Sequence, residues 1–144
     1  MEKIVISYAN KIEKAYIEHI KNNVKNKNFE LIYEENSGSV EEYLELVKKI
    51  QNKEIGRVIS IEEFGTLPFM VMAKNKGIVV AQISDHHSSR MTIQHNNSNV
   101  LSLGYKIMAK ENMVDIIETY LGAHFEAGRH MVRINMLENI LEGE

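Results

Sequence analysis

Residues 84–104, SDHHSSRMTIQHNNSNVLSLG, predict a helix, a short polar turn and a buried strand in direct succession. Ser84 and Asp85 are polar residues suited to a helix start, and a helical run follows them. The run stops at residues 95–97, because asparagine tolerates the left-handed backbone that often ends a helix. Residues 100–104 then have the apolar pattern of a buried strand that is closed by a glycine.

The same alternation of strand and helix continues outward from this stretch in both directions. Apolar runs and alternating patterns predict further strands at residues 4–7, 29–33, 57–61 and 78–83. Helical spacing predicts helices between them; Ser39 and Glu42 form a capping box at the start of one, and Pro68 fits the first position of another. The pattern predicts an α/β fold in which a parallel sheet is covered by helices on both faces.

Composition limits the kind of protein. A chain of 144 residues with 44% hydrophobic content suits one globular domain over residues 1–144. The formal charge of -3, without a long Lys/Arg stripe, argues against a nucleic-acid partner. The absence of cysteine removes disulfides, thiolate zinc sites and a cysteine nucleophile. The apolar run at residues 4–6 is too short for a signal peptide or a membrane span, so we expect a cytoplasmic protein without a membrane partner.

Two polar groups are candidates for proton chemistry. His95 and Asn96 offer a donor and an acceptor for a sugar or carbonyl oxygen, and an imidazole that titrates near neutrality can move a proton either way. The alternative is a surface turn that asparagine caps. Glu62 and Glu63 follow a central strand, where ligands of a parallel sheet collect, and a carboxylate there can serve as a general base. The alternative is a charge pair that favours the dipole of the next helix.

Arg129 and Arg133 lie four residues apart at the start of the last predicted helix. Both guanidinium groups therefore leave one face of that helix, close to its exposed backbone N–H groups, which makes a plausible phosphate clamp. The alternative is a pair of solvated arginines. Together with the polar groups above, the clamp indicates a small phosphorylated metabolite. Metal-ligand spacings and the dinucleotide and P-loop fingerprints are missing from the sequence, so we expect no metal and no cofactor.

Three stretches together resemble a known family: residues 84–104, FGTLPFMVMAKNKGIVVA at residues 64–81 and FEAGRHMVRINML at residues 125–137. The order HNN-x-N-V-L followed by G-R-H-x-x-R is similar to the sugar-phosphate isomerases that comprise ribose-5-phosphate isomerase B (RpiB) and the galactose-6-phosphate isomerase subunits LacA and LacB. The resemblance covers most of the chain from Arg57 onward. It implies a Rossmann-like three-layer sandwich with a five-stranded parallel sheet and a C-terminal helix.

The resemblance also implies an aldose–ketose isomerase whose active sites are shared between two subunits. His95 takes the position of the histidine that opens the sugar ring, and Asn96 that of the amide that holds substrate oxygens. Arg129 and Arg133 take the positions of the arginines that bind the phosphate. In such enzymes a cysteine after the third strand removes the proton next to the carbonyl, and a glycine-rich loop stabilises the enediolate.

One half of that site departs from the family pattern. The cysteine position falls on Glu62, and the glycine-rich loop survives only as Gly65 and Thr66, with bulky residues at 67–68. Ala9 and Asn10 replace an expected Asp-His pair. This asymmetry looks like a LacA subunit, which implies conversion of D-galactose 6-phosphate to D-tagatose 6-phosphate with a LacB-like partner that supplies the cysteine. We expect a homo- or heterodimer or a tetramer.

Two alternatives remain open at this point. The chain can be a self-sufficient isomerase of another pentose or hexose phosphate that uses Glu62 as its base. It can also be a catalytically degraded subunit that binds a sugar phosphate or supports a related enzyme, because kinship of fold alone does not fix function.

Overall fold

The computed structural model describes residues 1–126 and 129–142. Within these residues, all strands pair in parallel in one five-stranded sheet of order β2-β1-β3-β5-β4. The strands are β1 (Glu2–Ala9), β2 (Phe29–Asn36), β3 (Arg57–Glu62), β4 (Val80–Gln82) and β5 (Val100–Gly104). The helices are α1 (Lys14–Asn23), α2 (Val40–Gln51), α3 (Thr66–Met72), α4 (His86–Asn96), α5 (Lys110–Gly122) and α6 (Arg129–Glu142).

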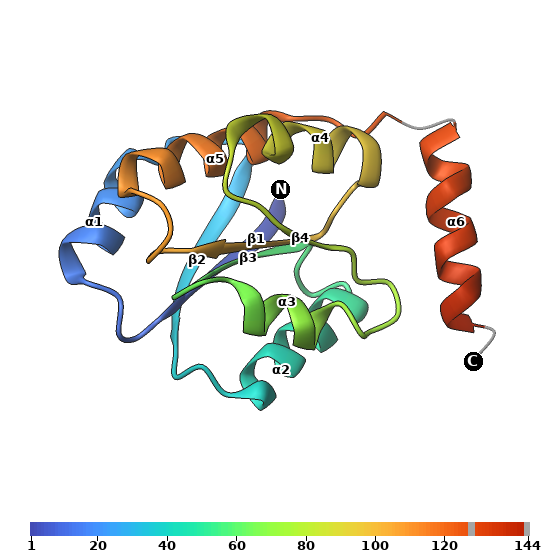
Figure 1. Cartoon of the computed structure of the whole chain (residues 1–144), viewed down its shortest axis with the longest axis horizontal. Coiled ribbons are helices and arrows are strands. Elements are labelled where there is room, and N and C mark those ends of the chain that lie inside the picture. Colours follow the sequence, from blue (N-terminus) through green and yellow to red (C-terminus); the bar gives the residue numbers. More distant parts are fainter. Residues whose placement is uncertain (127–128, 143–144) are drawn as a thin grey trace.

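Helices cover both faces of the sheet, which confirms the predicted three-layer sandwich. Figure 1 shows α1, α4 and α5 on one face and α2 and α3 on the other. Successive residues of a strand point to opposite faces, so Ile4 and Ile6 of β1 pack in one core cluster and Val5 packs in the second. Each such fully buried aliphatic side chain stabilises the fold by about 1.5–3 kcal/mol.

The expected ends of α2 and α4 are confirmed. The Ser39 hydroxyl accepts a hydrogen bond from the Glu42 backbone, and the Glu42 carboxylate accepts one from the Ser39 backbone, so the capping box is complete. Asn97 ends α4 with a left-handed φ of 48°. The strand predicted at residues 29–33 is β2, and it lies at one edge of the sheet.

The expected start of α3 at Pro68 is wrong by two residues. The helix begins at Thr66 and ends at Met72, and Gly65 precedes it with a φ of 85°. Proline fits any position of the first helical turn, because the backbone N–H that it lacks has no intrahelical partner there. The left-handed turn at Gly65 therefore sets the start of the helix, not the proline.

The strand expected over residues 78–83 is shorter than predicted, and β4 covers only Val80–Gln82. The Val79 backbone N–H donates to the Asn99 side chain at 2.9 Å, so this group is not available for the strand ladder. β4 also lies at the sheet edge and pairs with β5 alone. The apolar run at residues 78–83 is therefore longer than the part of it that pairs with β5.

The C-terminal helix α6 stands beside the body of the molecule, near the end of α4 (Figure 1). Much of its apolar surface is exposed, including Val132, Met136, Leu137 and Ile140. A monomeric protein rarely leaves a contiguous apolar helix face in water, so this face is suited to contact with another chain. None of the helices in the described ranges has the length and apolar character needed to cross a bilayer.

Candidate active site

The turn that follows α4 holds His95 and Asn96 in a fixed backbone conformation. The Asn97 backbone N–H closes the helix by donating to carbonyl oxygens of its last turn. The next residue, Ser98, is buried; its hydroxyl accepts from Thr92 at 2.9 Å and its carbonyl accepts from the Tyr120 hydroxyl at 2.8 Å. These bonds anchor the turn to the buried residues Thr92 and Tyr120. The side chain of His95 is partly exposed, and that of Asn96 is exposed.

A shallow pocket lies beside this turn, along the edge of the sheet. It is lined by Ala81, Gln82, Ile83, Ser88, Met91, Thr92, His95 and Asn96. The imidazole and the amide therefore face a hollow that is bordered by the edge strand β4. This arrangement confirms that the sequence places these two side chains together at a helix C-terminus; their catalytic role stays a prediction.

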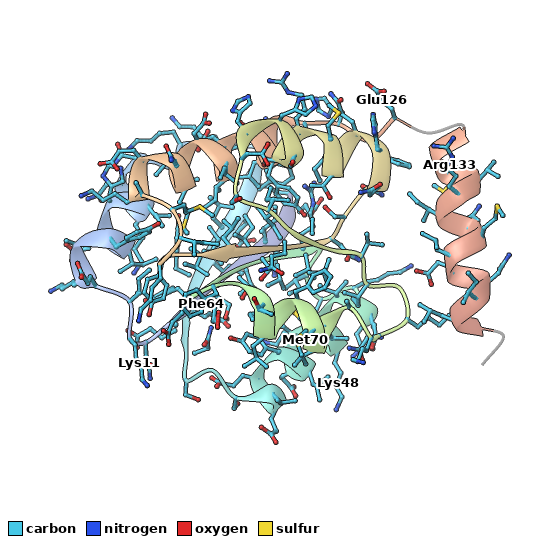
Figure 2. All side chains as sticks on the ribbon, viewed as in Figure 1. Lys11, Lys48, Phe64, Met70, Glu126 and Arg133 are labelled. Carbon is cyan, nitrogen blue, oxygen red and sulfur yellow. The ribbon has the colours of Figure 1, made fainter. Side chains whose placement is uncertain are left out.

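The helix that carries the two arginines starts next to the same turn. The Glu126 backbone N–H donates to the Gln94 carbonyl oxygen at 2.9 Å, which joins the segment before α6 to the last turn of α4. Arg133 lies in the first half of α6 and is exposed (Figure 2). Arg129 is the first residue of α6, and its side chain lies outside the described part of the structure.

A second pocket, of about 200 Å³, lies at the carboxyl ends of β1, β2 and β3. Here the chain goes from β1 to β2 on one side and then returns to β3 on the other, and such switch points are where parallel sheets bind ligands. The pocket is smaller than the roughly 300–1,000 Å³ of ordinary ligand sites. Its lining residues are Ala9, Asn10, Lys11, Ser37, Gly38, Tyr43, Glu62, Glu63, Leu67 and Tyr105.

Glu62 is held by the backbone of the turn that follows it. One carboxylate oxygen, Oε1, accepts hydrogen bonds of 2.8 Å from both the Phe64 and the Gly65 N–H groups. Gly65 has a left-handed φ of 85°, and a Cβ there would lie 3.2 Å from the Ser102 hydroxyl, so glycine suits this position best. The Thr66 hydroxyl lies 3.3 Å from the Gln82 side-chain amide, which donates to it.

Sequence reasoning missed two features of this pocket. Lys106 pairs with Glu63 at 2.9 Å; the hydrogen bond and the charge of this lysine lower the pKa of Glu63, and Glu63 in turn raises the pKa of Lys106. The only sequence signal for this ion pair was the position of Lys106, two residues after Gly104 at the end of β5. The second feature is Tyr43, whose hydroxyl is buried without a hydrogen-bond partner among the described residues, and burial raises its pKa to about 12.

The structure places the two groups of predicted site residues at opposite ends of the sheet. α4 leaves the carboxyl end of β4 and returns to the amino end of β5, so His95 and Asn96 lie at the amino end. Glu62 and Gly65 lie at the carboxyl end of β3. In Figure 2 the labelled Phe64 and Arg133 mark these two ends. The two groups therefore line different pockets of the chain.

Comparison with known proteins adds a family to this geometry. A family model described as Ribose/Galactose Isomerase matches residues 5–137. The chain is 38% identical over 131 residues to galactose-6-phosphate isomerase subunit LacA of Clostridium acetobutylicum, covering 86% of this chain and 89% of that protein. It is 32% identical over 125 residues to the LacA subunit of Streptococcus pneumoniae, covering 85% of this chain and 89% of that protein.

A solved structure shares the fold over nearly the whole chain. Ribose-5-phosphate isomerase B of Clostridium thermocellum superposes with a TM-score of 0.84 at 25% identity, covering 98% of each chain. The five-stranded parallel sheet and its flanking helices are therefore the architecture of a known group of sugar-phosphate isomerases.

Proposed function

This chain belongs to the ribose/galactose isomerase family, and we propose that it is the LacA-type subunit of a galactose-6-phosphate isomerase. The reaction converts D-galactose 6-phosphate to D-tagatose 6-phosphate. A base removes the proton from C2 of the ring-opened aldose, and the resulting enediolate is protonated at C1. The proton of the O2 hydroxyl passes to O1, so that C2 becomes the carbonyl and C1 the alcohol. The oxidation states of C1 and C2 are exchanged without an external oxidant or reductant.

One observation carries the proposal: the His95 turn and the start of α6 lie together, at the end of the sheet remote from Glu62. The imidazole can protonate the ring oxygen during ring opening, and Asn96 can hold a substrate oxygen. Arg129 and Arg133 supply guanidinium groups for the phosphate. In this proposal, the chain contributes the residues that bind the substrate and the histidine that opens its ring.

The base must then come from a second chain. The described part of the structure offers no thiol, and Glu62, the acid at the family's cysteine position, is committed to backbone N–H groups. We propose a LacB-like partner that presents a cysteine and a glycine-rich loop to the His95 turn, in a heterodimer or a tetramer. The names of the LacA relatives, which are those of subunits, support a multi-chain assembly.

The chain also has exposed apolar side chains that a partner could cover. Phe64, Leu67 and Met70 are exposed on the turn before α3 and on α3 itself, and the exposed face of α6 adds a second apolar surface. Burying such side chains between chains is the usual driving force of a permanent interface. The same proposal includes a cytoplasmic enzyme, because a phosphorylated hexose is charged and does not cross a bilayer unaided.

The altered segments Ala9-Asn10 and Leu67-Pro68 favour a second candidate function. In it, the chain binds a sugar phosphate or supports a related enzyme, but contributes no residue to turnover. Coexpression with a LacB-like chain, followed by assays on D-galactose 6-phosphate and D-ribose 5-phosphate, separates the two. The proposal expects turnover of the hexose phosphate that falls at least 100-fold when His95 is changed to alanine in this chain. Unchanged turnover in that variant would assign the chain to the supporting role.

A further inference from the structure

In the turn after β3, the backbone N–H and carbonyl groups of Phe64 and Gly65 all form hydrogen bonds within the chain. The Phe64 and Gly65 N–H groups both point at one Glu62 oxygen, at 2.8 Å each. The Gly65 carbonyl accepts from the Ser102 hydroxyl at 2.6 Å, and the Phe64 carbonyl accepts from the Gln82 side chain at 3.2 Å. The turn is therefore a closed hydrogen-bonded unit.

Successive backbone N–H groups that converge on one point form a concave site for a negatively charged oxygen. In catalysis of proton transfer next to a carbonyl, such a pair is the ordinary means of stabilising the developing oxyanion. In this chain, the point on which the two N–H groups converge already holds a carboxylate oxygen of the same chain. A substrate oxygen would have to displace the Glu62 carboxylate, which is negatively charged and only two or three residues away along the chain.

We infer that Glu62 acts as an internal plug: its carboxylate fills the N–H pair of Phe64 and Gly65 and closes the carboxyl-end pocket of this chain to the anionic intermediate of the isomerase reaction. This inference rests on the proposed function, and it explains why the two kinds of site in a mixed assembly are not equivalent. Glu62 is then neither a base nor a ligand but the residue that restricts this chain to one half of one site.

The surroundings of the plug support the same conclusion. A second carboxylate, Glu63, lines the pocket and pairs with Lys106 at 2.9 Å, so the charge of this lysine is already balanced within the chain. The turn also packs closely against β5, because a Cβ at Gly104 would lie 2.7 Å from the Phe64 carbonyl carbon. This contact supports the backbone of the N–H pair from the side of the sheet.

Amide hydrogen exchange of the full-length chain tests the plug directly. We expect the Phe64 and Gly65 amides to exchange slowly, and to remain unchanged when D-galactose 6-phosphate is added to saturation. Glu62→Ala should accelerate both at least tenfold, whereas Glu62→Gln, whose amide oxygen can still accept both bonds, should not. Glu63→Ala is the matched control, since it removes the neighbouring carboxylate without touching the N–H pair. Slower exchange of the Gly65 amide in the wild-type chain on addition of the sugar phosphate would overturn the inference.

Binding stoichiometry tests the consequence for the assembly. Calorimetric titration of the complex with a cysteine-bearing LacB-like chain should give one D-galactose 6-phosphate for every two chains. One sugar phosphate per chain would contradict the plug while leaving the proposed function intact. A complex that does not turn over the sugar phosphate, but in which Glu62→Ala alone accelerates the two amides, would remove the proposed function and leave the plug.

Discussion

The Glu126 backbone N–H donates a hydrogen bond of 2.9 Å to the carbonyl oxygen of Gln94. Gln94 directly precedes His95 in the last turn of α4, and Glu126 lies three residues before Arg129. This hydrogen bond joins the residue before the candidate ring-opening histidine to the segment that precedes α6. The turn and this segment, which we assign to one half of the active site, are thus linked through their backbones.

Changing His95 to alanine should lower kcat of the active assembly by about 10²–10⁴, the usual contribution of a general acid or base. Thermal unfolding should be little affected, because the side chain is only partly buried at a helix end. His87→Ala is the control, since His87 is exposed in the first turn of the same helix. A His95→Ala enzyme that retains more than a tenth of the wild-type kcat would exclude this role.

Changing Arg133 or Arg129 to alanine should mainly raise KM. Contacts to the phosphate act equally in the ground state and the transition state, so their loss weakens binding more than it slows the chemical step. A hydrogen bond to a charged group is worth about 1.5–3 kcal/mol, which corresponds to roughly 10–100-fold in KM. Lys48→Ala, which removes an exposed positive charge from α2, should leave KM unchanged. A fall in kcat at constant KM would argue against phosphate binding.

Substitutions of Asn97 should change stability through the backbone conformation at this position, not through loss of its side-chain amide. Its φ of 48° costs an ordinary residue about 1–2 kcal/mol, and glycine pays no such cost. Asn97→Ala should therefore lower the free energy of unfolding by about 1 kcal/mol in urea titrations, and Asn97→Gly should not. If both variants are equally destabilised, a side-chain contact and not the left-handed backbone determines this position.

Much of the fold follows from local sequence signals, and what was missed depends on contacts between distant residues. The Ser39–Glu42 cap and the end of α4 are visible in the sequence because each requires only a few neighbouring residues. The short β4 was not predictable from its apolar run, because the Asn99 side chain that takes the Val79 N–H comes from 20 residues away.

The candidate site shows the same division. The turn with His95 and Asn96 is visible in the sequence, since two polar residues at a helix end need no tertiary information. The ion pair of Glu63 with Lys106, and the Tyr43 hydroxyl that has no hydrogen-bond partner in residues 1–126 and 129–142, depend on separate elements that meet in space, so the sequence alone did not reveal them. The separation of the two halves of the site likewise follows from the direction in which α4 returns along the sheet.

The capping box of α2 should make stability depend on pH. Hydrogen bonds from the Ser37 hydroxyl and from the backbone of Ser39 and Ser37 lower the pKa of Glu42 from 4.5 to about 2. Because the pKa in the folded state lies below the unfolded value, this stabilisation is present above about pH 4.5 and is lost as the pH falls toward 2. Chemical denaturation of wild type and Glu42→Gln should show a difference that shrinks across this range.

Glu45→Gln is the control for this pH effect, because Glu45 lies on the same helix, is exposed and takes no part in the cap. Its difference from wild type should be small at every pH. A difference between wild type and Glu42→Gln that stays constant down to pH 2 would show that the charge of Glu42 does not stabilise the cap.

The most direct measurement is the rate at which D-galactose 6-phosphate becomes D-tagatose 6-phosphate with this chain alone, with a cysteine-bearing LacB-like chain alone, and with the two mixed. If the active site is assembled from the His95 turn and α6 of one chain and the thiol of the other, only the mixture turns over at the full rate. Turnover by this chain alone at the rate of the mixture would contradict the account.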